Sequence, residues 1–334
     1  MGYTVDCCHS YQDFSFHHGK DVLDTKHINK LFKINNYNDY LKISKEYDIL
    51  FCIDIIDATP GQIQVGYQNF KNNIKTIYLI GDLFIHQKPC EHIYYKMEHE
   101  VLNNINPYLI VFSGQFLKKR TVNLINKIKY STVILNSPLF EDIELNSSKN
   151  VKYNNGDNIK IVLISSITDK IGHFYNYIDV LKKLTMDERI HIDIYTPVSN
   201  LKYKDVYNIK NVNIKETIPI SNVNNTLRKY HIGLLYYNDN IDKKYLLQID
   251  LTEPNKLYDY YFAELPILST VHSKSLQDII NEKKLGITID LNNETNLYSK
   301  LSSLIKNYKH NNTVYQSFDD QKSQKIINTL IRRY

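Results

Sequence analysis

The side chains best suited to binding a phosphorylated ligand lie in one short segment that begins at Thr252. Threonine is a good N-cap and proline is tolerated at the first position of a helix, so Thr252 and Pro254 predict a helix start. A helix start presents free backbone N–H groups and a positive dipole end, which attract phosphate. Lys256 adds a full positive charge in the first turn, and Asp259, four residues after Asn255, lies on the same helical face. A carboxylate there is suited to accepting two hydrogen bonds from a ribose diol.

A second set of polar residues follows a strand predicted in the first half of the chain, over residues 74–80. Asp82 and His86 come directly after this strand, and carboxylate and imidazole are the usual general bases of enzymes. Both are therefore candidate catalytic residues. No Asp-x-Asp pair stands near a strand end in this half of the chain, so we expect no metal.

Short β-branched runs alternate with helix-period segments along the whole chain, which is typical of doubly wound parallel α/β domains. The run Ile161–Ile164 is apolar on both faces, as a buried parallel strand requires. A polar, turn-rich break near residues 144–158 separates two such series. The sequence thus predicts an N-terminal α/β domain over residues 1–147, a C-terminal α/β domain over 148–312, and a terminal helix over 313–334 that packs back on the first domain. The strands expected are 3–7, 48–53, 74–80, 109–112, 132–135, 160–164, 190–195, 212–217, 232–235, 267–269 and 287–289; the helices are 37–45, 91–104, 115–129, 172–184, 221–229, 255–264, 273–283 and 293–306.

Composition excludes several classes of protein. The 334 residues carry 41 Lys+Arg and 36 Asp+Glu, a net charge of +5, which is too small and diffuse for us to expect a nucleic-acid partner. The four cysteines form no C-x-x-C pair, so no disulfide scaffold is expected. There is no apolar run of about 20 residues and no signal-peptide pattern at the N-terminus, so we expect a cytoplasmic protein.

The segment from Leu251 to Thr270 resembles the donor-binding motif P-x-K-[LF]-[YF]-[ED]-Y…(G)-x-P-[IV]-[ILV]-[AS]-T of GT-B glycosyltransferases, of the retaining family 4 or group 1 type. The resemblance extends in order through the second half, with 161–172 similar to the opening strand and phosphate loop, 212–221 similar to the nucleobase-binding stretch and 230–237 similar to a later strand. Two departures stand out. The usual E-x7-E pair is here E-x5-D, formed by Glu253 and Asp259, and Glu264 replaces the usual glycine before Leu-Pro. No glycine-rich acceptor loop precedes Tyr3, so the first βα unit of the family is expected to be missing or disguised.

The resemblance implies two Rossmann-like domains that face a cleft, with a nucleotide-sugar donor in the second domain and a glycan, lipid or other glycoconjugate acceptor in the first. It implies retaining transfer, with the nucleotide sugar as substrate and no metal or other cofactor. The candidate donor-binding residues are Lys170, Thr217, Pro219, Glu253, Pro254, Asn255, Lys256, Leu257 and Asp259, and the candidate catalytic residues are Asp82, His86 and Glu253.

Two other functions stay open at this stage. A sugar-nucleotide epimerase on the same fold would need acid and base groups from the first domain at the donor C2. A catalytically silent binding subunit would account for the altered acidic pair. The basic cluster Lys118-Lys119-Arg120 is typical of a solvated helix start, with an acidic acceptor or peripheral contact with membrane headgroups as the alternative. The nucleobase, sugar, acceptor and oligomeric state are not determined by the sequence.

Overall fold

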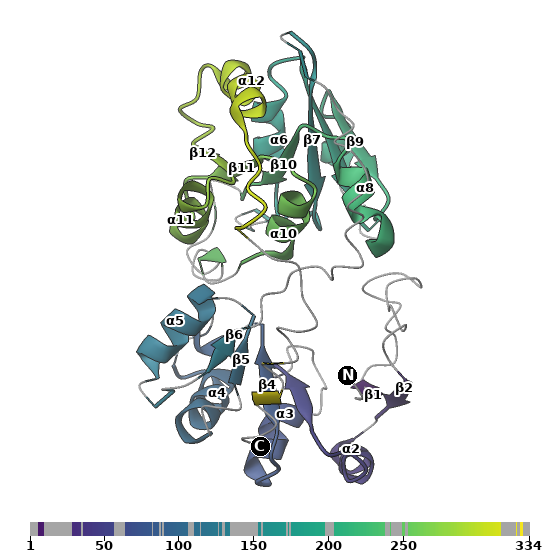
Figure 1. Cartoon of the computed structure of the whole chain (residues 1–334), viewed down its shortest axis with the longest axis vertical. Coiled ribbons are helices and arrows are strands. Elements are labelled where there is room, and N and C mark those ends of the chain that lie inside the picture. The colour runs from purple at the N-terminus through teal and green to yellow at the C-terminus, as the bar shows by residue number, and fades with distance from the viewer. Residues whose placement is uncertain are drawn as a thin grey trace. The chain divides into compact units, whose positions relative to one another are not determined.

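The computed structural model of the chain describes residues 6–9, 29–34, 36–56, 64–81, 83–86, 88, 90–105, 110–113, 115–125, 127–128, 131–133, 153–154, 156–171, 173, 175–197, 204–237, 241, 249–250, 253–314, 325 and 328–329. The chain divides into two compact units (Figure 1). Unit 1 comprises residues 1–136 with 319–334, and unit 2 comprises residues 137–318.

Unit 1 contains parallel β-sheet with helices between the strands. Strands β3 (Phe51–Ile53), β4 (Ile77–Ile80), β5 (Ile110–Phe112) and β6 (Thr132–Val133) form a four-stranded sheet in the order β3-β4-β5-β6, with every pairing parallel. Strands β1 (Asp6–His9) and β2 (Lys30–Lys33) form a separate parallel pair. The helices are α2 (Tyr37–Ser44), α3 (Val65–Lys71), α4 (Ile93–Asn104) and α5 (Gln115–Leu124), with a 3-10 turn η2 (Phe84–His86) after β4.

A buried amide joins the elements of unit 1. Asn69 of α3 is fully buried, and its Oδ1 accepts a hydrogen bond from the Tyr37 hydroxyl at 2.8 Å. Its Nδ2 donates to the Tyr40 hydroxyl and to Thr76 Oγ1, both at 3.0 Å. One side chain thus connects helix α2, helix α3 and the residue that precedes β4.

Unit 2 is built on a six-stranded parallel sheet with the order β12-β11-β10-β7-β8-β9. From β7 the chain proceeds outward through β8 to β9, and then returns to the other side of β7 for β10, β11 and β12. The strand order therefore reverses between β7 and β10, which is the topological switch point of this sheet. The strands are β7 (Ile159–Ile164), β8 (Ile190–Tyr195), β9 (Val212–Lys215), β10 (Ile232–Leu235), β11 (Ile267–Thr270) and β12 (Gly286–Ile289).

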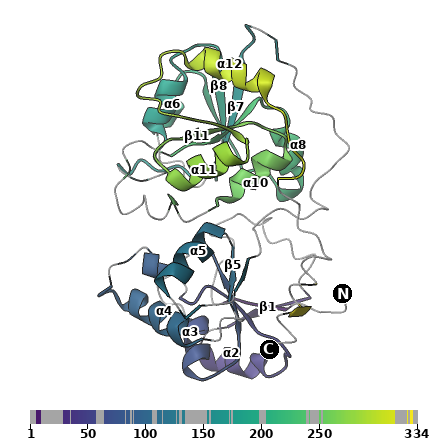
Figure 2. The same cartoon turned by 60° about the vertical axis from the view of Figure 1, so that its left-hand side comes forward.

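Helices cover both faces of this sheet (Figure 2). Helices α6 (Ile178–Leu184) and α12 (Leu297–Asn307) contribute to one apolar core with alternate residues of β7 and β8. Helices α8 (Val223–Leu227), α10 (Asn255–Phe262) and α11 (Lys274–Glu282) lie on the other face, and α7 (Lys204–Tyr207) and the 3-10 turn η6 (Ile220–Asn222) complete the unit. The doubly wound α/β class expected from the sequence is confirmed in both units.

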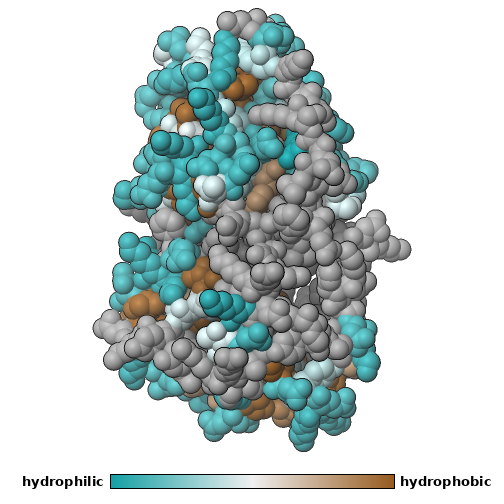
Figure 3. Space-filling model, viewed as in Figure 1, coloured by the Kyte–Doolittle hydropathy of each residue, from teal (hydrophilic) through white to brown (hydrophobic). Residues whose placement is uncertain are grey.

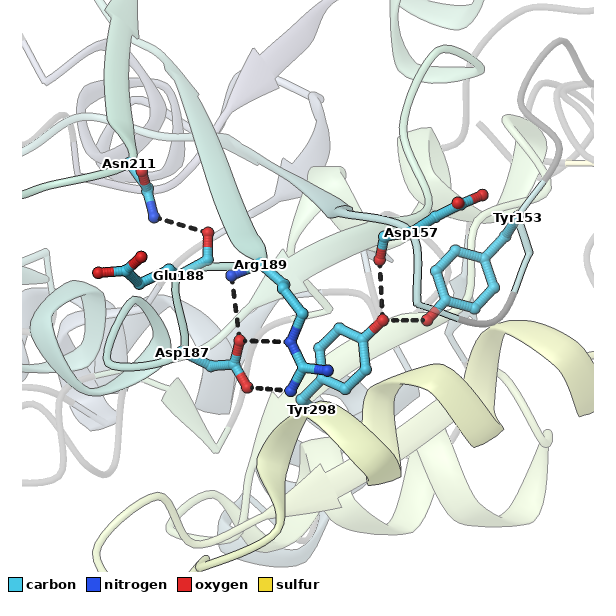
Figure 4. Close-up of polar contacts among 7 residues, drawn as sticks. All are labelled: Tyr153, Asp157, Asp187, Glu188, Arg189, Asn211 and Tyr298. Carbon is cyan, nitrogen blue, oxygen red and sulfur yellow. Dashed lines mark hydrogen bonds and ion pairs between the residues drawn. The ribbon is translucent and has the colours of Figure 1, made fainter.

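The amino-terminal edge of the same sheet is held by a cluster around Arg189 (Figure 4). The Arg189 guanidinium donates to both carboxylate oxygens of Asp187, at 2.9 and 2.6 Å, and stacks 3.5 Å from the ring centroid of Tyr298. The Tyr298 hydroxyl donates to the Asp157 carbonyl and meets the Tyr153 hydroxyl. This cluster fixes helix α12 to the loops that precede β7 and β8.

Several expected elements have different bounds in the structure. The helix expected from residue 172 begins at Ile178, because the segment before it forms turns in which Asn176 Oδ1 accepts the Ile178 N–H. The helix expected over residues 115–129 ends at Leu124. Strand β2 and helix α3 were not expected at all, since each is short and carries charged or polar residues on both sides of its few apolar ones.

The described surface is ordinary for a folded domain. On the face drawn in Figure 3, the described residues are mostly hydrophilic, with small and separate hydrophobic areas. Among the described helices, none has both the length and the apolar character that crossing a bilayer requires.

Candidate functional site

The candidate site lies where helix α10 begins, at the carboxyl ends of β7 and β10. The N-cap is Pro254, in an extended conformation, and no side chain of the described residues caps this end. Proline has no N–H and no acceptor on its side chain, so it does not cap these amides; within the first turn, the Leu257 N–H bonds the Pro254 carbonyl at 2.8 Å. Thr252, expected as the cap, lies outside the described residues. Because open parallel sheets bind ligands at the switch point, the position of this helix start favours a binding site.

Lys256 in the first turn points toward the ends of these two strands. Its Nζ lies 3.3 Å from Ser165 Oγ, directly after β7, and 3.3 Å from the Tyr177 hydroxyl. Three tyrosine rings, of Tyr175, Tyr177 and Tyr237, have centroids 5.7, 5.9 and 5.7 Å from the same nitrogen. Burial lowers the pKa of Lys256 from its ordinary value of 10.5 to about 8, although nearby Tyr175 and Asp259 favour the charged form.

Asp259, one turn further along the helix, is a poorly solvated acid. Burial raises the pKa of Asp259 from 3.8 to about 7, and the Lys256 charge offsets only part of this effect. Within the described residues, no donor makes a hydrogen bond to the Asp259 carboxylate, and no ion pair joins it to Lys256. A half-buried carboxyl group to which the described residues offer no donor is typical of a position that a ligand completes.

The other predicted residues of this segment have distinct environments. Glu253 is half-buried, and its Oε2 accepts a hydrogen bond from the Tyr258 hydroxyl at 2.7 Å. Asn255 is exposed, whereas Leu257 is fully buried and its N–H bonds the Pro254 carbonyl. Glu253, Lys256 and Asp259 therefore share one end of one helix.

Three predicted donor-binding residues lie on other loops of unit 2. Lys170 is exposed between β7 and α6, and its backbone N–H donates to Thr168 Oγ1 at 3.3 Å. Thr217 and Pro219 are exposed on the loop after β9, the edge strand of the sheet. Across the described part of the chain, no hydrogen bond or ion pair connects the side chains of these three residues with helix α10.

Of the two predicted catalytic residues in unit 1, the structure describes His86. His86 is buried, and its Nε2 lies 2.9 Å from Thr121 Oγ1 of α5. Burial and the charge of Arg120 lower the pKa of His86 from 6.5 to about 4, so its ring is neutral at pH 7. Asp82 lies outside the described residues. The catalytic roles of both stay predictions.

The tyrosines around the site were missed by reasoning from the sequence. Tyr260 of α10 is fully buried. Its single O–H is shared between the Val162 and Leu234 carbonyls, at 3.3 and 3.2 Å, and its oxygen accepts the Ile164 N–H at 3.1 Å. It thus bridges β7 and β10 beyond the point where the two strands stop pairing. The tyrosine-rich run over residues 258–261 favours packing of the helix, but neither this run nor the count of 28 tyrosines says which rings meet.

The end of the same helix accommodates the unusual Glu264. Glu264 has φ 61°, its N–H bonds the Tyr261 carbonyl, and the Leu265 N–H bonds the Tyr260 carbonyl. This is the Schellman motif, in which glycine is preferred at the left-handed position. The Glu264 carboxylate pairs at 3.1 Å with Arg228, which is only 4% exposed, so an ion pair offsets the backbone strain.

Comparisons with known proteins identify the fold. No family model matches the chain, and no curated protein matches it. Among solved structures, HepE from Anabaena in complex with UDP and glucose is similar with a TM-score of 0.60 at 11% identity, over 92% of this chain and 87% of that one. A glycosyltransferase from Rickettsia africae is similar with a TM-score of 0.51 at 14% identity, over 93% and 84% of the two chains. WaaG, a glycosyltransferase involved in lipopolysaccharide biosynthesis, gives 0.50 at 9% identity, over 83% and 77%. The chain has the GT-B fold that these structures share.

Proposed function

We propose that the chain is a glycosyltransferase that binds a nucleotide sugar in unit 2 and transfers the sugar to a glycan, lipid or other glycoconjugate held by unit 1. The observation that carries this proposal is that Lys256 and Asp259 both lie in the first turns of α10, whose start has no side-chain cap, at the switch point of the sheet. The GT-B fold supports it, since HepE, with the same fold, was solved in complex with UDP and glucose.

The chemistry of the proposed donor site follows from its charges. Breaking the bond between the sugar and the diphosphate places negative charge on the leaving phosphate. The first-turn amides of α10 and the Lys256 ammonium stabilise that charge without a metal, and Lys170 adds a second cation from its loop. Asp259 in its ionised form accepts hydrogen bonds from the ribose diol, and Glu253 holds sugar hydroxyls.

The remaining predicted residues have secondary roles in this proposal. The loop that holds Thr217 and Pro219 contacts the nucleobase through its backbone. Transfer with retention at the front face needs no general base, which is compatible with a neutral His86 bonded to Thr121. Asp82 and His86 therefore contribute to the acceptor side rather than to donor binding.

A donor panel tests the proposal. The protein is mixed with UDP-, GDP-, ADP-, CMP- and dTDP-sugars, and melting temperature and nucleotide release are followed. A donor at a hundredfold excess over its Kd stabilises the protein by about 2.7 kcal/mol. Stabilisation with slow hydrolysis supports a transferase, C2 epimerisation of the donor indicates an epimerase, and binding without turnover in the presence of an acceptor panel indicates a silent subunit. A protein that no nucleotide stabilises contradicts the donor site.

A matched pair of variants places the binding on α10. Lys256→Met should weaken the binding of the nucleotide by about 10-fold or more, the usual effect of losing a charged hydrogen bond. Lys274 occupies the first turn of α11 and is 83% exposed in its side chain, so Lys274→Met is the control and should bind within about twofold of wild type. Equal losses in both variants would indicate a general charge effect and remove Lys256 from the site.

A further inference from the structure

Lys256 is half-buried as a residue, and the surroundings of its poorly solvated ammonium group are unusual for a lysine. Among the described residues, no carboxylate lies within ion-pair distance of its Nζ. Asp259 affects the pKa of Lys256 through its charge, without a hydrogen bond or ion pair. Buried lysines are normally paired with an acid, because burying an uncompensated charge is costly. Here three aromatic rings and two hydroxyl groups occupy the position that a counter-ion would take.

The two hydroxyl groups come from opposite ends of one loop. Ser165 follows β7, and Tyr177 precedes α6 and is fully buried. Ser165 Oγ and the Tyr177 hydroxyl lie 3.0 Å apart, and each is 3.3 Å from Lys256 Nζ. Both oxygens accept from the ammonium group, since a protonated lysine is a donor only, and one hydroxyl donates to the other. Two of the three ammonium N–H donors are used in this way, and the third remains for a ligand.

The rings hold the positive charge without neutralising it. Aromatic faces attract cations through their quadrupole and carry no net charge. A carboxylate in their place would cancel the ammonium charge and repel an incoming phosphate. Burial raises the pKa of Tyr177 and of Tyr237, so both phenols stay neutral. The charge of Lys256 is thereby oriented but not compensated inside the protein.

We propose that Ser165, Tyr175, Tyr177 and Tyr237 are positioning residues that orient the Lys256 ammonium toward the diphosphate of the donor. This inference rests on the proposed function, because it deepens the role of the same site. Tyr177 acts through its hydroxyl and its ring, whereas Tyr175 and Tyr237 act through their rings. None of the four needs to contact the transferred sugar.

A double-mutant cycle tests whether these residues act through Lys256. Binding of UDP is measured by calorimetry for wild type, Tyr177→Phe, Lys256→Met and the double variant. Tyr177→Phe keeps the ring and removes the hydroxyl, and should weaken binding by about 10-fold in wild type and by less than about twofold in the Lys256→Met background. Tyr298→Phe removes a phenol at the amino-terminal edge of the sheet and should change binding by less than about twofold in both backgrounds. Equal effects of Tyr177→Phe in the two backgrounds overturn the inference.

A measurement without ligand separates this inference from the proposed function. The pKa of the Lys256 amine is followed by NMR in wild type, Tyr177→Phe and Tyr237→Leu. Each variant removes a group that favours the ammonium form, so the amine pKa should fall below its value in wild type. Tyr298→Phe should leave it unchanged. A protein that shows these shifts but that no nucleotide of the donor panel stabilises refutes the donor assignment and keeps the lysine environment, whereas unchanged amine pKa values refute the positioning role even when a nucleotide binds.

Discussion

Replacing Asp259 by asparagine should make the protein more stable and a poorer ligand binder. The substitution keeps the shape of the side chain and removes a charge that is held in a poorly solvated position, where none of the residues described by the structure donates a hydrogen bond to it. Asparagine has no ionised form, so the variant does not pay the desolvation of a carboxylate at neutral pH. Stabilisation combined with lost binding is the signature of a residue retained for function.

The magnitude follows from the pKa of this group. An increase from 3.8 to about 7 corresponds to about 4 kcal/mol at roughly 1.4 kcal/mol per pKa unit. Because Asp259 is only partly shielded from solvent, we take about 2 kcal/mol as the smallest gain. The size of this destabilisation depends on pH. Between about pH 4 and pH 7 the unfolded chain releases this proton while the native state keeps it, so the native state loses stability as the pH rises, and above 7 the loss is constant.

Urea denaturation at pH 5 and pH 8 measures this effect. The stability advantage of Asp259→Asn over wild type should be larger at pH 8 than at pH 5, with an unchanged m-value. Asp278→Asn, in the exposed Lys274–Asp278 pair of α11, is the control and should change stability by less than about 0.5 kcal/mol at either pH. An Asp259→Asn variant that is no more stable than wild type at pH 8 would show that the carboxylate is solvated or has donors, and the argument for a ligand-completed acid would fail.

The same two groups predict the pH dependence of nucleotide binding. Affinity should rise as Asp259 ionises near pH 7 and fall as Lys256 loses its proton near pH 8. The Asp259→Asn variant should bind UDP about 10-fold more weakly and lose the rising limb of this profile. A rising limb that persists in the variant would assign it to another group.

Three further substitutions test the packing that supports the site. Glu264→Ala and Glu264→Gly both lose the ion pair with Arg228, but only alanine keeps a Cβ at φ 61°, so the alanine variant should be less stable than the glycine variant by about 1 kcal/mol in urea denaturation. Gly233→Ala should destabilise unit 2 by about 3 kcal/mol, because an added Cβ would meet Cγ of the buried Tyr260 ring at 2.4 Å, and a melting temperature equal to that of wild type would show that the ring moves freely. Asn69→Ala removes the hydrogen bonds that join α2, α3 and β4, and should cost about 2 kcal/mol or more by the same assay, whereas no loss would mean that water replaces the amide.

The fold was largely predictable because the strands of unit 2 are strong local signals. The bounds of β8 and β10 agree with those expected, since β8 alternates isoleucine with other residues and β10 is a short apolar run. Strand β2 was missed because two lysines enclose its two apolar residues. The start of α6 was expected too early, since helical periodicity continues through residues that the structure uses for turns.

The chemistry of the site was only partly predictable. Lys256 and Asp259 were found because a helix start, a lysine and an acid follow one another closely in the sequence. The groups around Lys256 come from the ends of β7 and β10 and from the residue before α6, and only the strand order brings them together. The positive φ of Glu264 was likewise hidden, because its compensation by Arg228 depends on a contact 36 residues apart.

The Tyr260 hydroxyl has a mechanical consequence for helix α10. The hydroxyl bonds the backbone of both β7 and β10, and the ring packs against Gly233. Together these contacts prevent helix α10 from rotating about its own axis. Lys256 lies one turn before Tyr260 in the same helix, and Asp259 lies one residue before it. The directions in which their side chains leave the helix are therefore fixed before any ligand binds. A helix that is fixed in this way loses little binding free energy to reorganisation, and a ligand must match the side-chain directions that the helix already has.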